Sequence, residues 1–221
     1  LTSAADAVTN LESEGVPTGR IHHVGNTLVD VVRRCEARAL ERASWRAAGL
    51  REHDYLVLAL HRPSALVART PALYDALIAL AERVPVVMLP PDLSWEAPQD
   101  DAAAAALAHD GVPLVVPSDH LDALSLLMGS GGVVTDDGAV QESCSAIGID
   151  CFTLGTLTER TVTLAYGSNR LLGDSPDALA RLAPSQGPGT PCAIRLWDGQ
   201  AGKRAAEAIV ANYVLQGEAL A

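Results

Sequence analysis

Residues 119–154, DHLDALSLLMGSGGVVTDDGAVQESCSAIGIDCFTL, alternate between helical and extended patterns. Ala and Leu recur at three- and four-residue spacing over 119–128, and small and apolar residues do so over 138–147. Val133 to Asp136 and Asp150 to Leu154 are instead short, mainly apolar runs that suit buried strands. This alternation is typical of a parallel sheet that is covered by helices.

The same alternation extends over the rest of the chain. Further strands are predicted at Ile21 to Val24, Tyr55 to Leu60, Val84 to Leu89, Val112 to Val115 and Arg170 to Leu172, and further helices near 27–43, 70–82, 99–109, 174–182 and 202–216. We therefore predict an α/β fold with a doubly wound parallel sheet, Rossmann-like, in a single domain over 1–221 with 198–221 as a closing helix. The Pro/Gly/Ser-rich segment Pro184 to Pro191 is interpreted as a crossover loop rather than a domain boundary.

Composition excludes several classes of protein. Of the 221 residues, 48% are hydrophobic and 19% charged, which suits one large domain with a sizeable core. The net charge is −11 and Lys203 is the only lysine, so nucleic acid and anionic membrane are poor partners. No apolar run approaches the roughly 18–20 residues of a membrane span, and we expect a cytoplasmic protein. The four cysteines form no C-x-x-C pair, and we expect neither a metal site nor a bound cofactor.

Ligands of open α/β sheets bind outside the carboxyl ends of the strands. The residues that follow the predicted strands are therefore candidates for a ligand site: Gly25, His61, Pro90, Pro117, Asp136 to Ala139 and Gly155 to Arg160.

Two of these positions carry suggestive chemistry. His61 and Arg62 follow a strand, although a histidine there is often only a structural group. TDDGAVQE, Thr135 to Glu142, runs from a strand through a small-residue turn into a helix, and the free amides of such a turn bind phosphate. The alternative is that Asp136 or Asp137 merely caps the helix.

Other motifs are interpreted without a catalytic role. GSGG at 129–132 precedes its strand, so it is predicted to be a turn rather than a dinucleotide loop. Ser143 to Ser145 lies inside a predicted helix without a nucleophile elbow, which argues against hydrolase chemistry. Asp119 and Asp122 are explained as a solvated, acidic first turn of a helix.

Several segments, in order, resemble the carboxyl-terminal half of the non-hydrolysing UDP-N-acetylglucosamine 2-epimerases. They are NLESEG at 10–15, VGNTLVD at 24–30, LHR at 60–62, PSDHLDALSLLMGSGGVVTD at 117–136, GAVQE at 138–142, TER at 158–160 and DGQAGKRAAEAI at 198–209. The resemblance implies a two-domain glycosyltransferase-B-type fold, of which this chain would be the nucleotide-binding half, without the amino-terminal catalytic domain.

The resemblance also implies a ligand and its contacts. The ligand would be a UDP-sugar, with its diphosphate on the amides of Asp137, Gly138 and Ala139. His61 would lie near the diphosphate and the sugar, as the one catalytic candidate of this half. Further substrate contacts would come from Arg62, Glu142 and Arg160.

The chemistry implied is elimination of UDP across C1 and C2 of the sugar, followed by its addition with C2 inverted. The acid and base carboxylates of the family lie in the amino-terminal domain, so we expect this chain alone to be inactive. Members of the family usually pair as homodimers, largely through the amino-terminal half, so the resemblance makes a homodimer possible and leaves self-association of this chain open.

The chain departs from the family pattern around the ligand. Asp137 stands where the family has serine, Ala139 where it has the second glycine, and Ser143 where it has the glutamate that binds ribose. Thr161 follows TER in place of proline, and the histidine expected near Leu89 is absent. A carboxylate beside a diphosphate is repulsive. Two alternatives therefore stand: a non-catalytic descendant that serves as a binding or assembly module, and the donor-binding domain of a glycosyltransferase.

Overall fold

A parallel sheet forms the centre of the molecule. The computed structural model describes residues 1–61, 63, 68, 70–90, 101–187 and 189–214. Its 5-stranded sheet has the order β2-β1-β3-β4-β5, and all neighbouring strands are parallel. The strands are β1 (Leu56–Ala59), β2 (Val86–Leu89), β3 (Val133–Thr135), β4 (Cys151–Leu154) and β5 (Asn169–Gly173). After β2 at one edge, the chain crosses back over β1 and adds β3 on the other side of β1. The strand order therefore changes direction between β1 and β3, and such folds bind ligands at this switch point.

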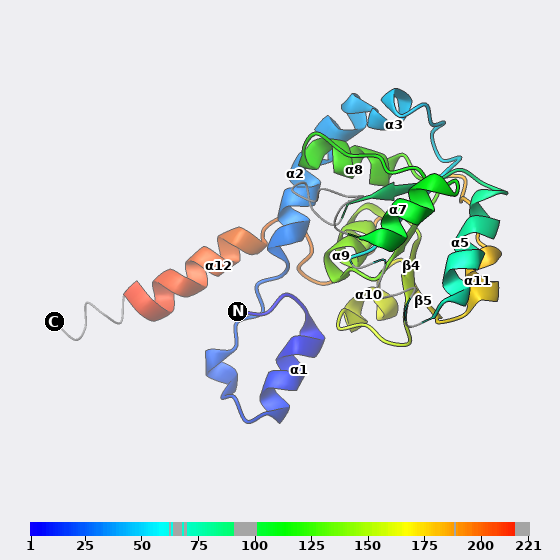
Figure 1. Cartoon of the computed structure of the whole chain (residues 1–221). Coiled ribbons are helices and arrows are strands. Elements are labelled where there is room, and N and C mark those ends of the chain that lie inside the picture. Colours follow the sequence, from blue (N-terminus) through cyan, green and yellow to red (C-terminus); the bar gives the residue numbers. More distant parts are fainter. Residues whose placement is uncertain (62, 64–67, 69, 91–100, 188, 215–221) are drawn as a thin grey trace.

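Helices connect the strands and cover the sheet (Figure 1). They are α1 (Ala5–Ser13), α2 (Thr27–Arg42), α3 (Ser44–Ala47), α5 (Ala72–Ala81), α7 (Ala102–His109), α8 (His120–Met128), α9 (Gly138–Ile147), α10 (Thr161–Ala165), α11 (Pro176–Ala180) and α12 (Ala201–Ile209). A 3-10 turn lies at Thr18–Arg20, and a π turn at Val210–Val214 continues α12.

Both faces of the sheet are buried, each by its own set of helices. Val57 and Ala59 of β1 belong to a core with residues of α2, α8 and α9. Leu56 and Leu58 belong to a second core with residues of α5, α7 and α11. Side chains of a strand alternate between faces, so a strand that is covered on both sides must be apolar throughout. The predicted doubly wound parallel sheet is thus confirmed.

Two predicted strands are not strands of the sheet. In Ile21 to Val24, His23 makes only an isolated parallel bridge with Thr2. In Val112 to Val115, Leu114 makes a single bridge with Met88 of β2. Pro113 lacks the N–H group that a longer ladder would need, which limits the pairing at that edge.

Three short helices were not predicted. α1 contains no buried residue, and α3 and α10 are only 4 and 5 residues long. Such segments show little of the apolar periodicity on which a helix prediction depends.

The first and last described segments of the chain meet in what we term the end junction, formed by Thr2, Ser3, Val24, Gly25, Leu196, Trp197 and Arg204. The Trp197 indole N–H donates to the Ser3 carbonyl at 3.0 Å, and the Arg204 guanidinium donates to the carbonyls of Val24 at 2.7 Å and Leu196 at 2.8 Å. Gly25 has φ +91°, and a Cβ there would lie 2.1 Å from the Leu196 oxygen, so only glycine fits this position.

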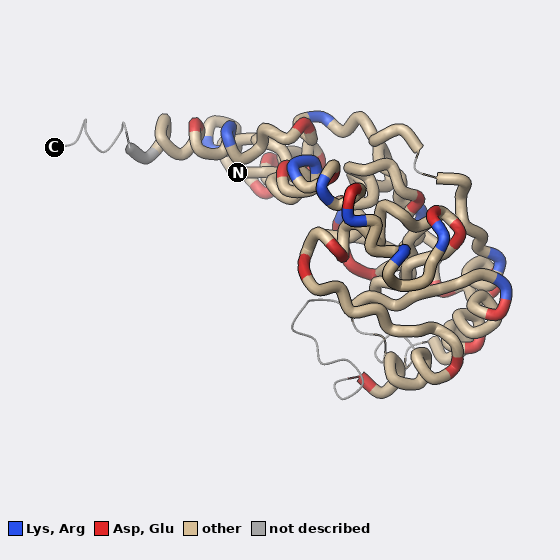
Figure 2. The backbone as a smooth tube through the Cα atoms, turned by 90° about the horizontal axis from the view of Figure 1, so that it is seen from above, with Lys and Arg blue, Asp and Glu red and all other residues tan. Residues whose placement is uncertain are grey.

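α12 begins against α2 and then extends away from the sheet (Figures 1 and 2). The Asp30 carboxylate of α2 accepts hydrogen bonds from the amides of Ala201 at 3.0 Å and Gly202 at 2.7 Å, which caps the start of α12. Within α12 only Ala201 is buried. The predicted helix over 202–216 is confirmed as far as the described residues reach. No helix in the described ranges has the length and apolar character that a bilayer span needs.

Candidate functional site

A cavity of about 880 Å³ opens at the carboxyl ends of β1, β3 and β4. Its lining comes from three loops: His61 after β1, Asp136 to Ala139 and Gln141 after β3, and Thr153 to Arg160 at the end of β4. Gly25, Pro90 and Pro117 also follow predicted strands, but they are not among the lining residues. The sequence thus identified the loops of the cavity, because strand order brings the ends of β1, β3 and β4 together.

Two hydrogen bonds join the end of β1 to the turn after β3. The buried Thr135 hydroxyl donates to the Ala59 carbonyl at 2.6 Å and accepts from the Asp137 amide at 2.9 Å. The Asp136 carboxylate accepts from the main-chain amide of His61 at 2.7 Å. Asp136 therefore holds the backbone that carries the His61 imidazole, and His61 is exposed at the cavity.

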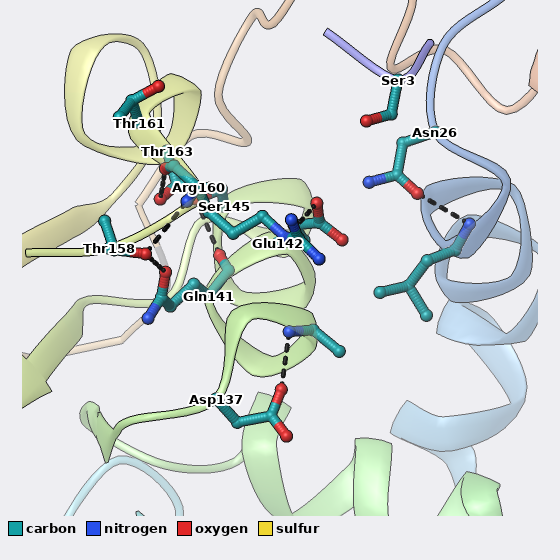
Figure 3. A network of polar contacts seen from close by, with 12 residues as sticks. Ser3, Asn26, Asp137, Gln141, Glu142, Ser145, Thr158, Arg160, Thr161 and Thr163 are labelled. Carbon is teal, nitrogen blue, oxygen red and sulfur yellow. Dashed lines mark hydrogen bonds and ion pairs between the residues drawn. The ribbon is translucent and has the colours of Figure 1, made fainter. Parts of the chain in front are cut away.

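The carboxylate of Asp137 caps α9. Its Oδ1 accepts hydrogen bonds from the amides of Ala139 at 2.6 Å and Val140 at 3.3 Å, and Figure 3 shows it at the start of the helix. Asp137 is therefore the N-cap of α9, as in the alternative to phosphate binding that the sequence left open. Because the N-terminus of a helix carries a partial positive charge, the aspartate places an anion where the chain offers anion-binding amides.

Arg160 lies over the same helix start. A Cβ on Gly138 would be 3.0 Å from both Cγ and Nε of Arg160, so glycine permits this close approach. Arg160 Nε forms an ion pair with Glu142 Oε1 at 3.0 Å, and the two side chains are 42% and 9% exposed. Glu142 is thus a buried partner of Arg160, and it does not line the cavity.

The loop that carries Arg160 is held from below by α9 (Figure 3). The Thr158 hydroxyl donates to the side-chain oxygen of Gln141 at 2.7 Å and accepts from the Arg160 amide at 3.0 Å. Sequence reasoning did not single out Gln141, since a glutamine inside a predicted helix gives no signal of its own. Its buried side chain ties this loop to α9.

The far end of this loop is anchored by α10 and by α1. The Thr163 hydroxyl donates to the Arg160 carbonyl at 2.7 Å and accepts from the Asn169 side chain at 3.0 Å. The Thr161 hydroxyl donates to the Asp6 carboxylate of α1, a helix distant in sequence. Arg160 is therefore supported on both sides.

The structure brings together most of the site residues that the sequence suggested. His61, Asp137, Gly138, Ala139 and Arg160 line one cavity. Glu142 does not line the cavity but forms an ion pair with Arg160, which does. Arg62 lies outside the described residues. Across the described ranges, no three His, Cys, Asp or Glu side chains converge in a metal-binding cluster.

Comparison with known proteins gives this geometry its context. The family profile described as UDP-N-acetylglucosamine 2-epimerase matches residues 1–210. The chain belongs to the UDP-N-acetylglucosamine 2-epimerase family. One relative in this family, the UDP-N-acetylglucosamine 2-epimerase of Methanocaldococcus jannaschii, is 26% identical over 184 residues, which cover 79% of this chain and 50% of the relative.

A second relative is the UDP-2,3-diacetamido-2,3-dideoxy-D-glucuronate 2-epimerase of Pseudomonas aeruginosa. It is 29% identical over 190 residues, which cover 80% of this chain and 49% of the relative. The chain thus spans about half the length of the epimerases that it matches.

Solved epimerase structures share the fold. The Methanocaldococcus jannaschii UDP-GlcNAc 2-epimerase in complex with UDP-GlcNAc and UDP superposes with a TM-score of 0.78 at 23% identity, covering 96% of this chain and 60% of that one. The Neisseria meningitidis enzyme bound to UDP-GlcNAc gives a TM-score of 0.76 at 19% identity, covering 95% and 60%. This chain therefore shares its fold with the corresponding part of these solved epimerases.

Proposed function

We propose that the chain is the UDP-sugar-binding half of a UDP-N-acetylglucosamine 2-epimerase-like enzyme. The observation that carries the proposal is the cavity at the switch point of the sheet, where the start of α9 and Arg160 lie side by side in a chain that matches the family over residues 1–210. We also propose that 1–221 is one nucleotide-binding domain, with 198–221 as its closing segment.

The lining offers what a nucleoside diphosphate needs. The start of α9 contributes the positive end of the helix dipole and the Gly138 amide. Arg160 adds a guanidinium directly above that turn, and guanidinium groups bind phosphate oxygens through planar, bidentate hydrogen bonds. His61 follows β1 and lines the same cavity, where its main-chain amide donates to Asp136 of the neighbouring turn.

The epimerisation itself is assigned to the full-length protein. Proton transfer at C2 of the sugar requires an acid and a base held within hydrogen-bond reach of that carbon. We propose that an amino-terminal domain of the family type supplies them across the cavity and forms most of a homodimer contact. These 221 residues alone are then expected to leave UDP-GlcNAc unconverted, and conversion by the isolated chain would contradict the proposal.

Ligand binding tests the proposal directly. Thermal unfolding is measured with UDP, UDP-GlcNAc and an adenine nucleotide, for the native chain and for Arg160→Ala. A ligand at a hundred times its dissociation constant stabilises a protein by about 2.7 kcal/mol. The uridine ligands are expected to raise the melting temperature of the native chain, and Arg160→Ala is expected to lose most of that shift.

Arg170→Ala is the matched control, because Arg170 lies on β5 with its side chain 70% exposed and pairs only loosely with Asp150 at 3.7 Å. It should keep the full uridine shift. Equal shifts with adenine and uridine nucleotides, or an Arg160→Ala variant that responds like the native chain, would count against a uridine site at this cavity.

A second candidate function is a binding or assembly module that has kept the fold without the ligand. The observation that favours it is the Asp137 carboxylate, which occupies the amides of Ala139 and Val140. Under this alternative, neither the native chain nor a variant without the Asp137 charge binds any uridine ligand.

A further inference from the structure

The anion-binding turn of the cavity already contains an anion of its own. Asp137 Oδ1 lies 2.6 Å from the Ala139 amide and 3.3 Å from the Val140 amide. Phosphate oxygens that bind at helix starts use the same donors at similar distances. A phosphate oxygen and Asp137 Oδ1 cannot both occupy these amides.

We propose that Asp137 is a specificity-determining residue of this cavity, which lowers the affinity for uridine ligands progressively as their phosphate charge increases. The inference rests on the proposed function, since it concerns the same ligand site. Under this proposal Asp137 does not change the affinity for the nucleoside, whereas it lowers the affinity for the phosphates.

The charges around the turn do not compensate for the carboxylate. Three lining residues are acidic: Asp136, Asp137 and Glu159. Among the described lining residues Arg160 is the one arginine or lysine, and its Nε is already paired with Glu142 at 3.0 Å. Repulsion between unit charges about 4 Å apart near a protein surface corresponds to far more than a tenfold loss of affinity.

The helix does not need this charge. Serine is as good an N-cap as aspartate, because its hydroxyl oxygen also accepts from the amides of the first turn. Asp137→Ser therefore keeps the cap of α9 and removes the negative charge. Asp137→Asn keeps the shape of the side chain as well, so the two variants together distinguish charge from size.

The test compares the dissociation constants of uridine, UMP and UDP by calorimetry. For Asp137→Ser we expect UDP to bind at least about tenfold more tightly than to the native chain, which corresponds to about 1.4 kcal/mol. The gain should be smaller for UMP and within about twofold for uridine. Asp137→Asn should reproduce this order of gains.

Asp119→Ser is the matched control, because Asp119 caps α8 by accepting from the Asp122 amide at 3.0 Å and is not part of the cavity lining. It should change none of the three affinities. Circular dichroism confirms that each variant is folded.

The outcomes distinguish a failure of the specificity role of Asp137 from a failure of the proposed function. If UDP and uridine bind Asp137→Ser with equal gains, or with none, the specificity role of Asp137 is overturned while the uridine site stands. If no variant and no native chain binds any of the three ligands, the proposed function is overturned, and the specificity role with it.

Discussion

Helices α8 and α9 begin in the same way and meet different surroundings. Each starts with an aspartate whose Oδ1 accepts a hydrogen bond from a main-chain amide of the first turn. Asp119 accepts from the Asp122 amide at 3.0 Å, and Asp137 accepts from the Ala139 amide at 2.6 Å. At α8 the Arg42 guanidinium pairs with both Asp119 and Asp122 at 2.8 Å. At α9 the described structure gives Asp137 no cationic partner within ion-pair distance, and the cavity lies beside it.

The surroundings, rather than the cap, separate a structural helix start from a candidate site. Hydrogen bonds from Ser118 and Arg42 hold the pKa of Asp122 well below its ordinary value, and the amide of Asp122 lowers the pKa of Asp119. The prediction of a solvated acidic turn at α8 was therefore only partly right, since Asp122 is 19% exposed and paired. Local sequence contains an aspartate at both helix starts and cannot distinguish them.

The largest expected effect is on UDP binding at the start of α9. Gly138→Leu should weaken UDP binding by more than about tenfold, because even its Cβ would lie 3.0 Å from Cγ and Nε of Arg160 and would displace that side chain. Calorimetry with UDP measures the loss. Gly19→Leu is the matched control, as nothing lies within 4 Å of a Cβ at Gly19. An unchanged affinity in Gly138→Leu would show that the ligand does not use this turn.

A stability experiment contrasts the two caps. Removal of an aspartate N-cap costs about 1 kcal/mol, so Asp137→Ala should lower the melting temperature by roughly 2–4 °C for a domain of this size. Asp119→Ala should lower it further, because Arg42 also loses a partner. Thermal unfolding without ligand measures both. An equal or larger decrease for Asp137→Ala would mean that the charges around α8 add nothing to its cap.

Acid should remove the contribution of Arg42 to the stability of the folded chain. Since Arg42 helps to lower the folded-state pKa of Asp122 and Asp119, the stabilisation is complete above their unfolded pKa, near 4, and is lost as the pH falls through the folded values. Arg42→Ala should thus melt below the native chain at neutral pH, with a gap that narrows under acid. A gap that is independent of pH would assign the effect of Arg42 to packing alone.

The smallest effect is expected at the outer support of the Arg160 loop. Thr161→Val removes the hydroxyl that donates to Asp6, and exposed contacts of this kind are worth less than about 1 kcal/mol. We expect a small decrease in melting temperature and a change in UDP affinity within about threefold. Thr9→Val is the comparison variant, because the exposed Thr9 hydroxyl donates to the Ala5 carbonyl of its own helix. A loss of affinity as large as that of Arg160→Ala would make α1 essential for positioning Arg160.

Sequence reasoning succeeded where the signal is local. All five strands of the sheet were predicted, most of them because they are short, mainly apolar runs between amphipathic helices. The loops that line the cavity followed from the rule that ligands bind beyond strand ends. Of the predicted contacts, Arg62 could not be evaluated, since it lies outside the described residues.

What the sequence could not predict depends on partners distant in the chain. Arg42 and Asp122 are 80 residues apart, and Asp6 and Thr161 are 155 apart. The ion pair that buries Glu142 against Arg160 likewise requires the loop after β4 to fold back over α9. Neither periodicity nor spacing specifies such pairings.

The end junction has a consequence for the order of folding. Ser3 and Trp197 are joined across 194 residues, and Trp197 is only 3% exposed. During synthesis the last strand of the sheet, which ends at Gly173, leaves the ribosome before Trp197 does. Contacts between such distant residues bear the largest loop-closure entropy, so the sheet can assemble before the junction closes. In a variant without the other two tryptophans, Trp45 and Trp95, the indole of Trp197 would therefore serve as a fluorescent reporter of the final stage of folding.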